Sequence, residues 1–164
     1  MARINHKQKD GFSGIPRRII EHPSFKSLSY SARSLLIQLG YQYRGKNNGN
    51  LVITFSILKD WFGSNTTMYR ARDSLYEAGF IVINAYGGQS GSGTKLPHLY
   101  ALTWESIDQL KGDSNWMRYT HYPANKAPLS YWKSGVNPDF KIKKERDNQY
   151  KKDVKKIKKT SISY

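Results

Sequence analysis

The sequence predicts a mixed α+β domain in which three helices precede a β-hairpin. Before residue 79, apolar residues recur at intervals of three and four, which is the helical period. After residue 79, two apolar runs flank a glycine-rich stretch, which is typical of a hairpin. Aliphatic residues become scarce after residue 112, so the 164 residues are expected to form one domain and an extension.

The first predicted helix follows Ser29, within a domain expected to span residues 14–111, and residues 1–13 are expected to be loose. The loop 45–50 ends this helix, because its Asn and Gly residues suit left-handed turns. A β-branched run at 51–53 predicts a first strand. The helix repeats apolar residues on one face: Ala32, Leu35, Leu36, Leu39 and Tyr43.

The stretch from Asn50 to Phe62 holds the second predicted helix, which Thr54 is expected to cap after the strand. Ser64 is expected to cap the third helix, and Gly79 fits the left-handed position at which a helix ends. The expected inward residues are Phe55, Leu58 and Phe62 in the second helix, and Met68, Ala71, Leu75 and Ala78 in the third.

Two further strands are predicted at 80–83 and 98–103, around a tip that runs from residue 86 to 97. The run 104–110 predicts a short helix that closes the domain. Residues 112–140 are a linker of prolines and aromatic residues, which cannot build its own core but could pack on the domain or on a partner. Residues 141–164 form a basic arm, expected to be largely extended or disordered.

The charge of the chain favours a polyanionic partner. Lys and Arg number 27 against 12 Asp and Glu, a net charge of +15. Ten of the cations lie between residues 141 and 159, with three acids. Each phosphate that such a surface contacts releases counterions, so we expect binding that weakens steeply with salt.

Composition excludes several other classes. There is no cysteine, and the four histidines are scattered, so we expect neither disulfides nor a metal site. The chain lacks an apolar run of about 18 residues and the apolar core of a signal peptide. The sequence therefore predicts a cytoplasmic protein without a membrane partner.

Two fragments resemble parts of enzyme motifs, but neither has the structural context that its motif requires. The tip GGQSGSGTK resembles a phosphate-binding loop, but a predicted strand follows it where such a loop needs a helix N-terminus. Pro138–Lys141 resembles part of a nuclease signature, yet nothing supplies the second carboxylate that its metal requires. We therefore expect no catalytic residues and no cofactor.

Residues from about 14 to 105 resemble the winged helix-turn-helix proteins of phages, plasmids and integrated elements. The resemblance rests on IPRRIIEHPSFKSLSYSARSLLIQL at 15–39, the NNG loop at 47–49, SNTTMYRAR at 64–72, EAGFI at 77–81 and HLYALTWE at 98–105. It departs from the pattern at Arg72, a position that is usually apolar, and at Asp73. The resemblance implies a duplex-DNA binder that is either a transcription regulator or a replication initiator.

In this family the third helix enters the major groove by its N-terminal half. Arg70 is expected to bind a guanine and Asn65 an adenine, while Asp73 is expected to accept from a cytosine or to orient Arg70. Lys95 is expected to bring the hairpin tip to the phosphates. The full set of predicted contacts is Ser64, Asn65, Thr66, Thr67, Tyr69, Arg70, Asp73 and Lys95, with Arg17, Arg18, Arg44 and Lys46 on the body and Lys143, Lys144, Lys151, Lys152, Lys155 and Lys156 on the arm.

Simpler roles stay open for these residues. Asn65 and Thr67 could merely complete the helix start, and Tyr69 could pack on the domain. A basic arm with tyrosines also suits RNA or single strands, which is the alternative of another class. Homodimerisation and contacts with replication or transcription proteins are the remaining partner hypotheses.

Overall fold

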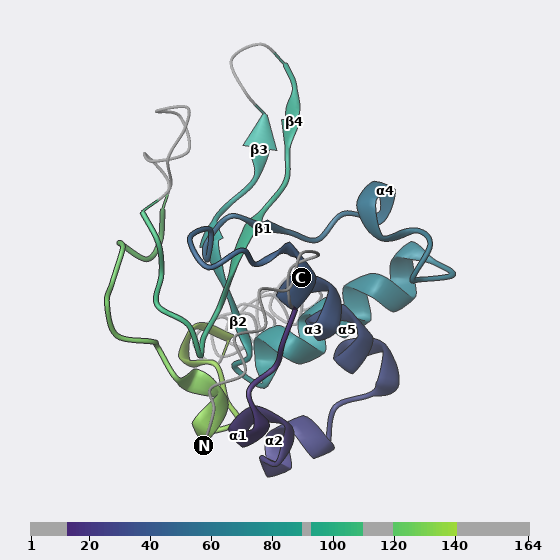
Figure 1. Ribbon diagram of the computed structural model, residues 1–164. Coiled ribbons are helices and arrows are strands. Elements are labelled where there is room, and N and C mark those ends of the chain that lie inside the picture. The colour runs from purple at the N-terminus through teal and green to yellow at the C-terminus, as the bar shows by residue number, and fades with distance from the viewer. Residues whose placement is uncertain (1–12, 90–92, 110–119, 141–164) are drawn as a thin grey trace, which may run out of the picture.

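The computed structural model describes residues 13–89, 93–109 and 120–140. In these ranges the chain is mixed α+β, with helices packed around a small antiparallel sheet (Figure 1). Two one-turn helices, α1 (Arg17–Ile20) and α2 (Pro23–Lys26), lead into the longer α3 (Tyr30–Gln42). None of the described helices is long and apolar enough to cross a lipid bilayer.

The start of α3 confirms the predicted cap. The Ala32 backbone N–H donates to the Ser29 side chain at 3.2 Å, which satisfies one of the otherwise unpaired groups of the first turn. The predicted inward residues of this helix are buried except Tyr43, which is half-buried. The loop after α3 leads into β1 (Leu51–Val52), the predicted first strand.

The second helix, α4 (Phe55–Leu58), is one turn long and ends before the predicted Phe62. Thr54 stands at its N-cap, but its side chain makes no cap hydrogen bond. Leu58 and Phe62 are buried, whereas Ile57 and Trp61 are more than half exposed. Because so little of this segment is buried, tertiary packing supports only the first turn.

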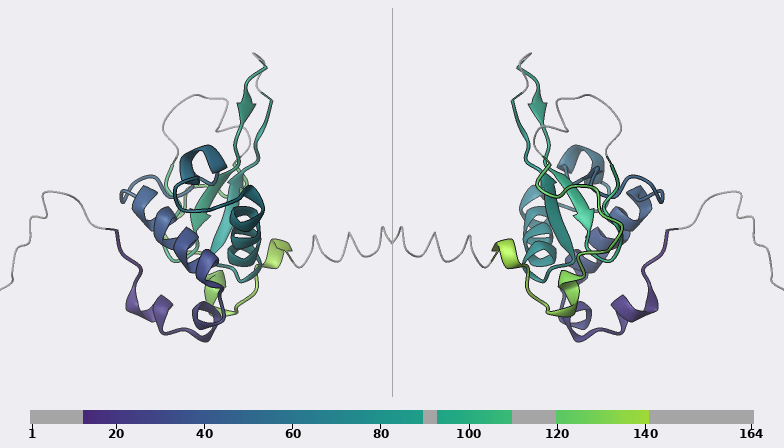
Figure 2. Two further views of the ribbon diagram at one scale, coloured as in Figure 1. Left: turned by 90° about the vertical axis from the view of Figure 1, so that its right-hand side faces the viewer. Right: turned by 90° about the vertical axis from the view of Figure 1, so that its left-hand side faces the viewer.

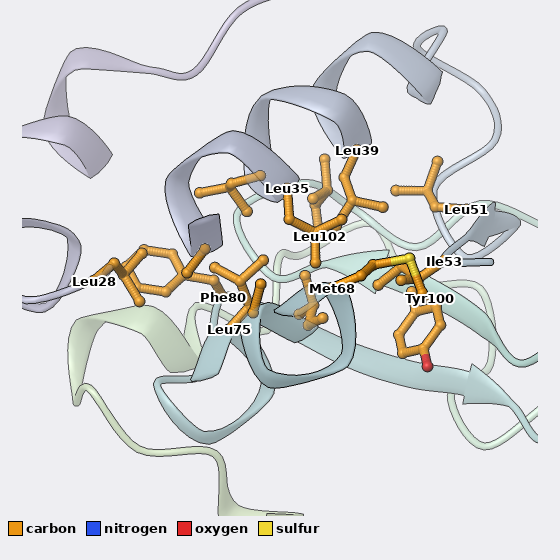
Figure 3. Packing of buried hydrophobic residues seen from close by; sticks show 14 of the residues in the cluster. Leu28, Leu35, Leu39, Leu51, Ile53, Met68, Leu75, Phe80, Tyr100 and Leu102 are labelled. Carbon is orange, nitrogen blue, oxygen red and sulfur yellow. The ribbon is translucent and has the colours of Figure 1, made fainter. Parts of the chain in front are cut away.

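The third predicted helix, α5 (Asn65–Glu77), is 13 residues long and packs against α3. Figure 3 shows Leu35 and Leu39 of α3 pointing towards Leu102 and towards Met68 and Leu75 of α5. These side chains are buried in one apolar core. The core therefore fixes which side of α5 faces inward.

The sheet has the order β1-β5-β2 and is antiparallel throughout, with β2 at Ile81–Ala85 and β5 at Leu99–Leu102. Two short strands, β3 (Gly88–Gln89) and β4 (Lys95–Leu96), extend this pair outward as a separate ladder. The β3–β4 extension projects from the body of the molecule (Figure 2). The predicted hairpin is confirmed.

Residues 104–109 do not form the predicted closing helix. The buried Asn48 binds this stretch and the end of β5 instead: its side-chain amide donates to the carbonyls of Leu102 at 2.9 Å, Ser106 at 3.0 Å and Glu105 at 3.3 Å. The Leu102 N–H donates back to the Asn48 side-chain oxygen at 2.7 Å. These carbonyls are satisfied by a distant loop, so the segment does not need helical hydrogen bonds.

The described part of the predicted linker, residues 120–140, packs on the domain. Trp132 belongs to the apolar core, within the short helix η1 (Tyr131–Lys133). Asn137 is fully buried; its N–H donates to the Glu77 carbonyl at 2.9 Å and its side chain to the Ile81 carbonyl at 3.2 Å. Of the two packing options that the sequence left open, the domain is the one observed. The arm beyond residue 140 lies outside the described residues.

Candidate nucleic-acid interface

Both ends of α5 are fixed by local signals in the sequence. At the start, the Thr67 N–H donates to the Ser64 side chain at 3.2 Å, as predicted. At the end, the Gly79 N–H donates to the Tyr76 carbonyl at 3.2 Å and the Phe80 N–H to the Leu75 carbonyl at 2.9 Å. This paired closure needs a left-handed residue, and Gly79 has φ of +75°. Hydrogen bonds thereby complete both ends of the helix.

The outward side of α5 is open along its N-terminal half. Met68, Ala71 and Leu75 are buried against the core, as predicted, and Ala78 is half-buried. The predicted contact residues of this helix and its cap are all exposed: Ser64, Asn65, Thr66, Thr67, Tyr69, Arg70 and Asp73.

The cap residues have a structural task of their own. The hydroxyls of Ser64 and Thr67 lie 3.0 Å apart and hydrogen-bond each other. Together with the N–H bond to Ser64 this completes the helix start. The simpler role therefore holds for Thr67, while both hydroxyls stay on the exposed surface.

Asp73 pairs with Arg72. Nε and Nη2 of Arg72 both donate to one Asp73 carboxylate oxygen, at 2.9 and 2.6 Å. The prediction that Asp73 orients Arg70 is therefore wrong. Asp73 pairs instead with its neighbour in the chain, Arg72. The guanidinium carbon of Arg72 also lies 4.8 Å from the centre of the Tyr69 ring, a cation–π contact.

A third partner reaches Arg72 from the sheet. Tyr100 of β5 is 2% exposed, and burial raises the pKa of its hydroxyl, against the effect of the charge and hydrogen bond of Arg72. Burial alone would lower the pKa of Arg72, but the hydrogen bonds to Asp73 and Tyr100 and their charge interactions hold that pKa above its ordinary value. The guanidinium is therefore firmly charged although its side chain is only 26% exposed.

Arg72 lines an open groove of about 570 Å³ between α5 and the β3–β4 hairpin. Tyr69 and Arg72 lie on the helix side, and Lys95 and His98 on the hairpin side. At the hairpin base the Gly87 N–H donates to His98 Nδ1 at 2.8 Å. A side chain at position 87 would clash with the Leu96 carbonyl oxygen, so the close approach of the two strands requires glycine there.

The predicted cations are spread over the molecule. Lys95 is exposed on β4 and lines the groove. Arg17 and Arg18 are exposed on α1, at the end of the molecule opposite the hairpin (Figures 1 and 2). Arg44 and Lys46 are exposed in the loop between α3 and β1. The predicted arm residues, from Lys143 to Lys156, lie outside the described residues.

Sequence reasoning missed Arg72 and Tyr100 as functional candidates. Arg72 attracted notice only as a cation at a position that is usually apolar. That departure is the available signal, since a charged residue at the edge of a buried helix face needs partners. Nothing near it in the sequence identifies Tyr100, which the fold brings to it.

In the described parts of the chain, no group of three His, Asp or Glu side chains is placed to hold a metal ion. No protein-family model, curated protein or solved structure matches this chain.

Proposed function

We propose that this chain is a winged helix-turn-helix protein that binds duplex DNA in a sequence-specific manner. The order α4, turn, α5 and hairpin supports this proposal. The observation that carries it is the open, polar side of α5, which exposes Arg70, beside a projecting hairpin. We propose further that it is a non-enzymatic, cytoplasmic transcription regulator of a mobile element.

In this proposal the N-terminal half of α5 enters the major groove. Arg70 is exposed and can donate two hydrogen bonds to a guanine, while Asn65 can bind an adenine edge. The β3–β4 hairpin acts as the wing and brings Lys95 to the backbone. The net charge of +15 supplies affinity that does not depend on sequence.

Replacing Arg70 with Ala tests the base-reading role. A good bidentate contact discriminates between bases by about 1–3 kcal/mol, so we expect Arg70→Ala to weaken binding to the cognate duplex roughly 5- to 150-fold and to a scrambled duplex much less. Cognate sites come from selecting bound oligonucleotides out of a random pool. Equal losses on both duplexes would reject base reading by Arg70.

The same selection separates the proposal from its alternatives. Enrichment of duplexes with a shared motif supports a sequence-specific binder, and the symmetry of the motif reports whether a dimer binds. Preference for single strands or RNA would contradict the proposal. Mapping bound sites across the genome then distinguishes a regulator from an initiator, because an initiator would occupy clustered repeats at an origin.

A further inference from the structure

We propose that Arg72 is a ligand for one backbone phosphate of the DNA, in the groove between α5 and the hairpin. Tyr100, Asp73 and Tyr69 are the residues that position it. This inference rests on the proposed function and assigns a distinct task within it. Arg72 would set affinity and register, whereas the exposed residues of α5 would read the bases.

Neighbouring side chains hold the Arg72 guanidinium in one position. Asp73 takes two of its N–H groups through one carboxylate oxygen, and the Tyr69 ring lies 4.8 Å from it. The buried Tyr100, which lines the same groove, interacts with its charge from the sheet. A free arginine loses considerable side-chain entropy when it binds. Here that loss has already occurred in the folded protein, so a phosphate meets a preorganised donor.

The Arg72 guanidinium keeps at least one N–H donor for a ligand. An arginine has five N–H donors in one plane. Two of them go to Asp73, and the Tyr100 oxygen has lone pairs for at most two more. At least one donor is therefore available to a ligand, on a guanidinium that is charged and lines the groove. Charge-assisted donation to a phosphate oxygen is among the stronger hydrogen bonds in proteins.

The groove that Arg72 lines also carries a cation on its hairpin side. Lys95 is exposed on its hairpin side, so cations face each other across the opening. Two glycines, Gly87 and Gly88, also line that side. Among the described residues, apart from the chain neighbours of Gly88, no atom lies within 4 Å of the position of a Cβ there, so this backbone is open to a close ligand. An open channel with cations on both sides suits a polyanionic strand that passes through it.

The position of Arg72 on the helix connects the groove to the base-reading surface. Residues 65, 69 and 72 are spaced by four and three, so Asn65, Tyr69 and Arg72 follow one flank of α5. The N-terminal end of this flank is the part proposed to enter the major groove. A phosphate at Arg72 would therefore belong to the strand that borders the groove read by Asn65.

The test compares Arg72→Gln with wild type on a fluorescent duplex of random sequence over a series of salt concentrations. We expect roughly tenfold weaker binding and a fall of about 1 in the slope of log K against log salt, since one phosphate contact is lost. Lys126→Gln is the control for the loss of one charge, because Lys126 is exposed and lies outside both α5 and the groove. It should retain more of this sequence-independent affinity than Arg72→Gln.

Tyr100→Phe tests the positioning role. It retains the ring and the charge of Arg72, so we expect several-fold weaker binding with an unchanged salt slope. Wild-type affinity in this variant would remove Tyr100 from the proposal. Circular dichroism and the Tm of each variant verify that it is folded.

These experiments distinguish failure of the phosphate contact at Arg72 from failure of the proposed function. Failure of the wild type to bind any duplex would sink both proposals. Duplex binding with the same affinity and slope in wild type and Arg72→Gln would overturn only the phosphate ligand. If inorganic phosphate raises the Tm of the wild type but not of Arg72→Gln, while duplex binding does not change, the groove takes a free anion and the proposal is wrong.

Discussion

Single residues with several hydrogen bonds connect distant parts of this chain. Asn48 binds a strand and the loop that follows it, and Asn137 binds the end of α5 and the start of β2. Both side chains are fully buried. A buried amide that loses its partners is costly, so each asparagine favours one arrangement of the backbone around it.

We expect Asn48→Ala to lower the free energy of unfolding by about 2–4 kcal/mol, because it leaves the backbone groups of Leu102 and Ser106 buried without partners. Urea denaturation measures the loss. Asn65→Ala is the matched control: Asn65 is exposed, so its loss should stay within about 0.5 kcal/mol. Similar losses in the two variants would contradict the role of Asn48.

At the scale of elements, the helix that carries the candidate site was the easiest to predict. The cap at Ser64, the spacing of Met68, Ala71 and Leu75 and the stop at Gly79 are all local signals, and each is confirmed. The predicted helix at 104–110 was wrong over its described residues because a distant side chain, Asn48, binds that backbone.

The contacts of the candidate site were harder to predict from the sequence than the helix itself. Arg72 and Tyr100 lie on different elements, and only the packing of α5 on the sheet brings them together. Asp73 has one cation three residues before it, Arg70, and one beside it, Arg72. Sequence alone could not tell which of the two it would bind. The exposed positions of α5 were predictable because the buried positions fix them by helical geometry.

Comparing substitutions at Gly79 and Gly45 separates the cost of a left-handed backbone from the cost of a steric clash at the end of α5. Gly79 and Gly45 both have positive φ, +75° and +82°. A Cβ at Gly79 would lie 2.8 Å from the Tyr131 carbonyl carbon, whereas one at Gly45 would meet nothing within 4 Å. We expect Gly45→Ala to cost about 1–2 kcal/mol from the backbone alone and Gly79→Ala to cost clearly more. Equal costs by urea denaturation would show that Tyr131 gives way.

At the scale of the whole molecule, buried and half-buried phenols should make stability fall at alkaline pH. Burial is the main cause that raises the pKa of Tyr43, Tyr76, Tyr100 and Tyr122, and Tyr122 also hydrogen-bonds Asp139. An unfolded tyrosine ionises near pH 10. A raised pKa means that the folded state holds the proton more tightly, so this stability is complete below about pH 10 and is lost as the pH rises towards the folded pKa.

Urea denaturation across this alkaline range measures the decline. Tyr122→Phe removes one of the titrating groups, so its unfolding free energy should fall less steeply with pH than that of the wild type. The lysines titrate in both proteins and cancel from the comparison. Parallel curves would mean that Tyr122 ionises equally easily in both states.

The distribution of charge gives a second prediction at this scale. Deleting residues 141–164 removes ten cations and three acids, a net +7 that leaves +8 of the original +15. We expect weaker binding to every duplex and a flatter dependence on salt, because fewer counterions are released. Affinity measured over a salt series tests this, and an unchanged slope would show that the arm does not contact DNA.

The packing of Trp132 and Asn137 onto the body has a practical consequence. A truncation at residue 111, where composition suggests a natural boundary, would uncover the apolar surface beneath the Trp132 indole and leave the Glu77 carbonyl of α5 without the N–H of Asn137. Such a fragment would be prone to aggregation and poor solubility. The smallest piece suited to crystallography or to fusion with a reporter therefore extends to residue 140.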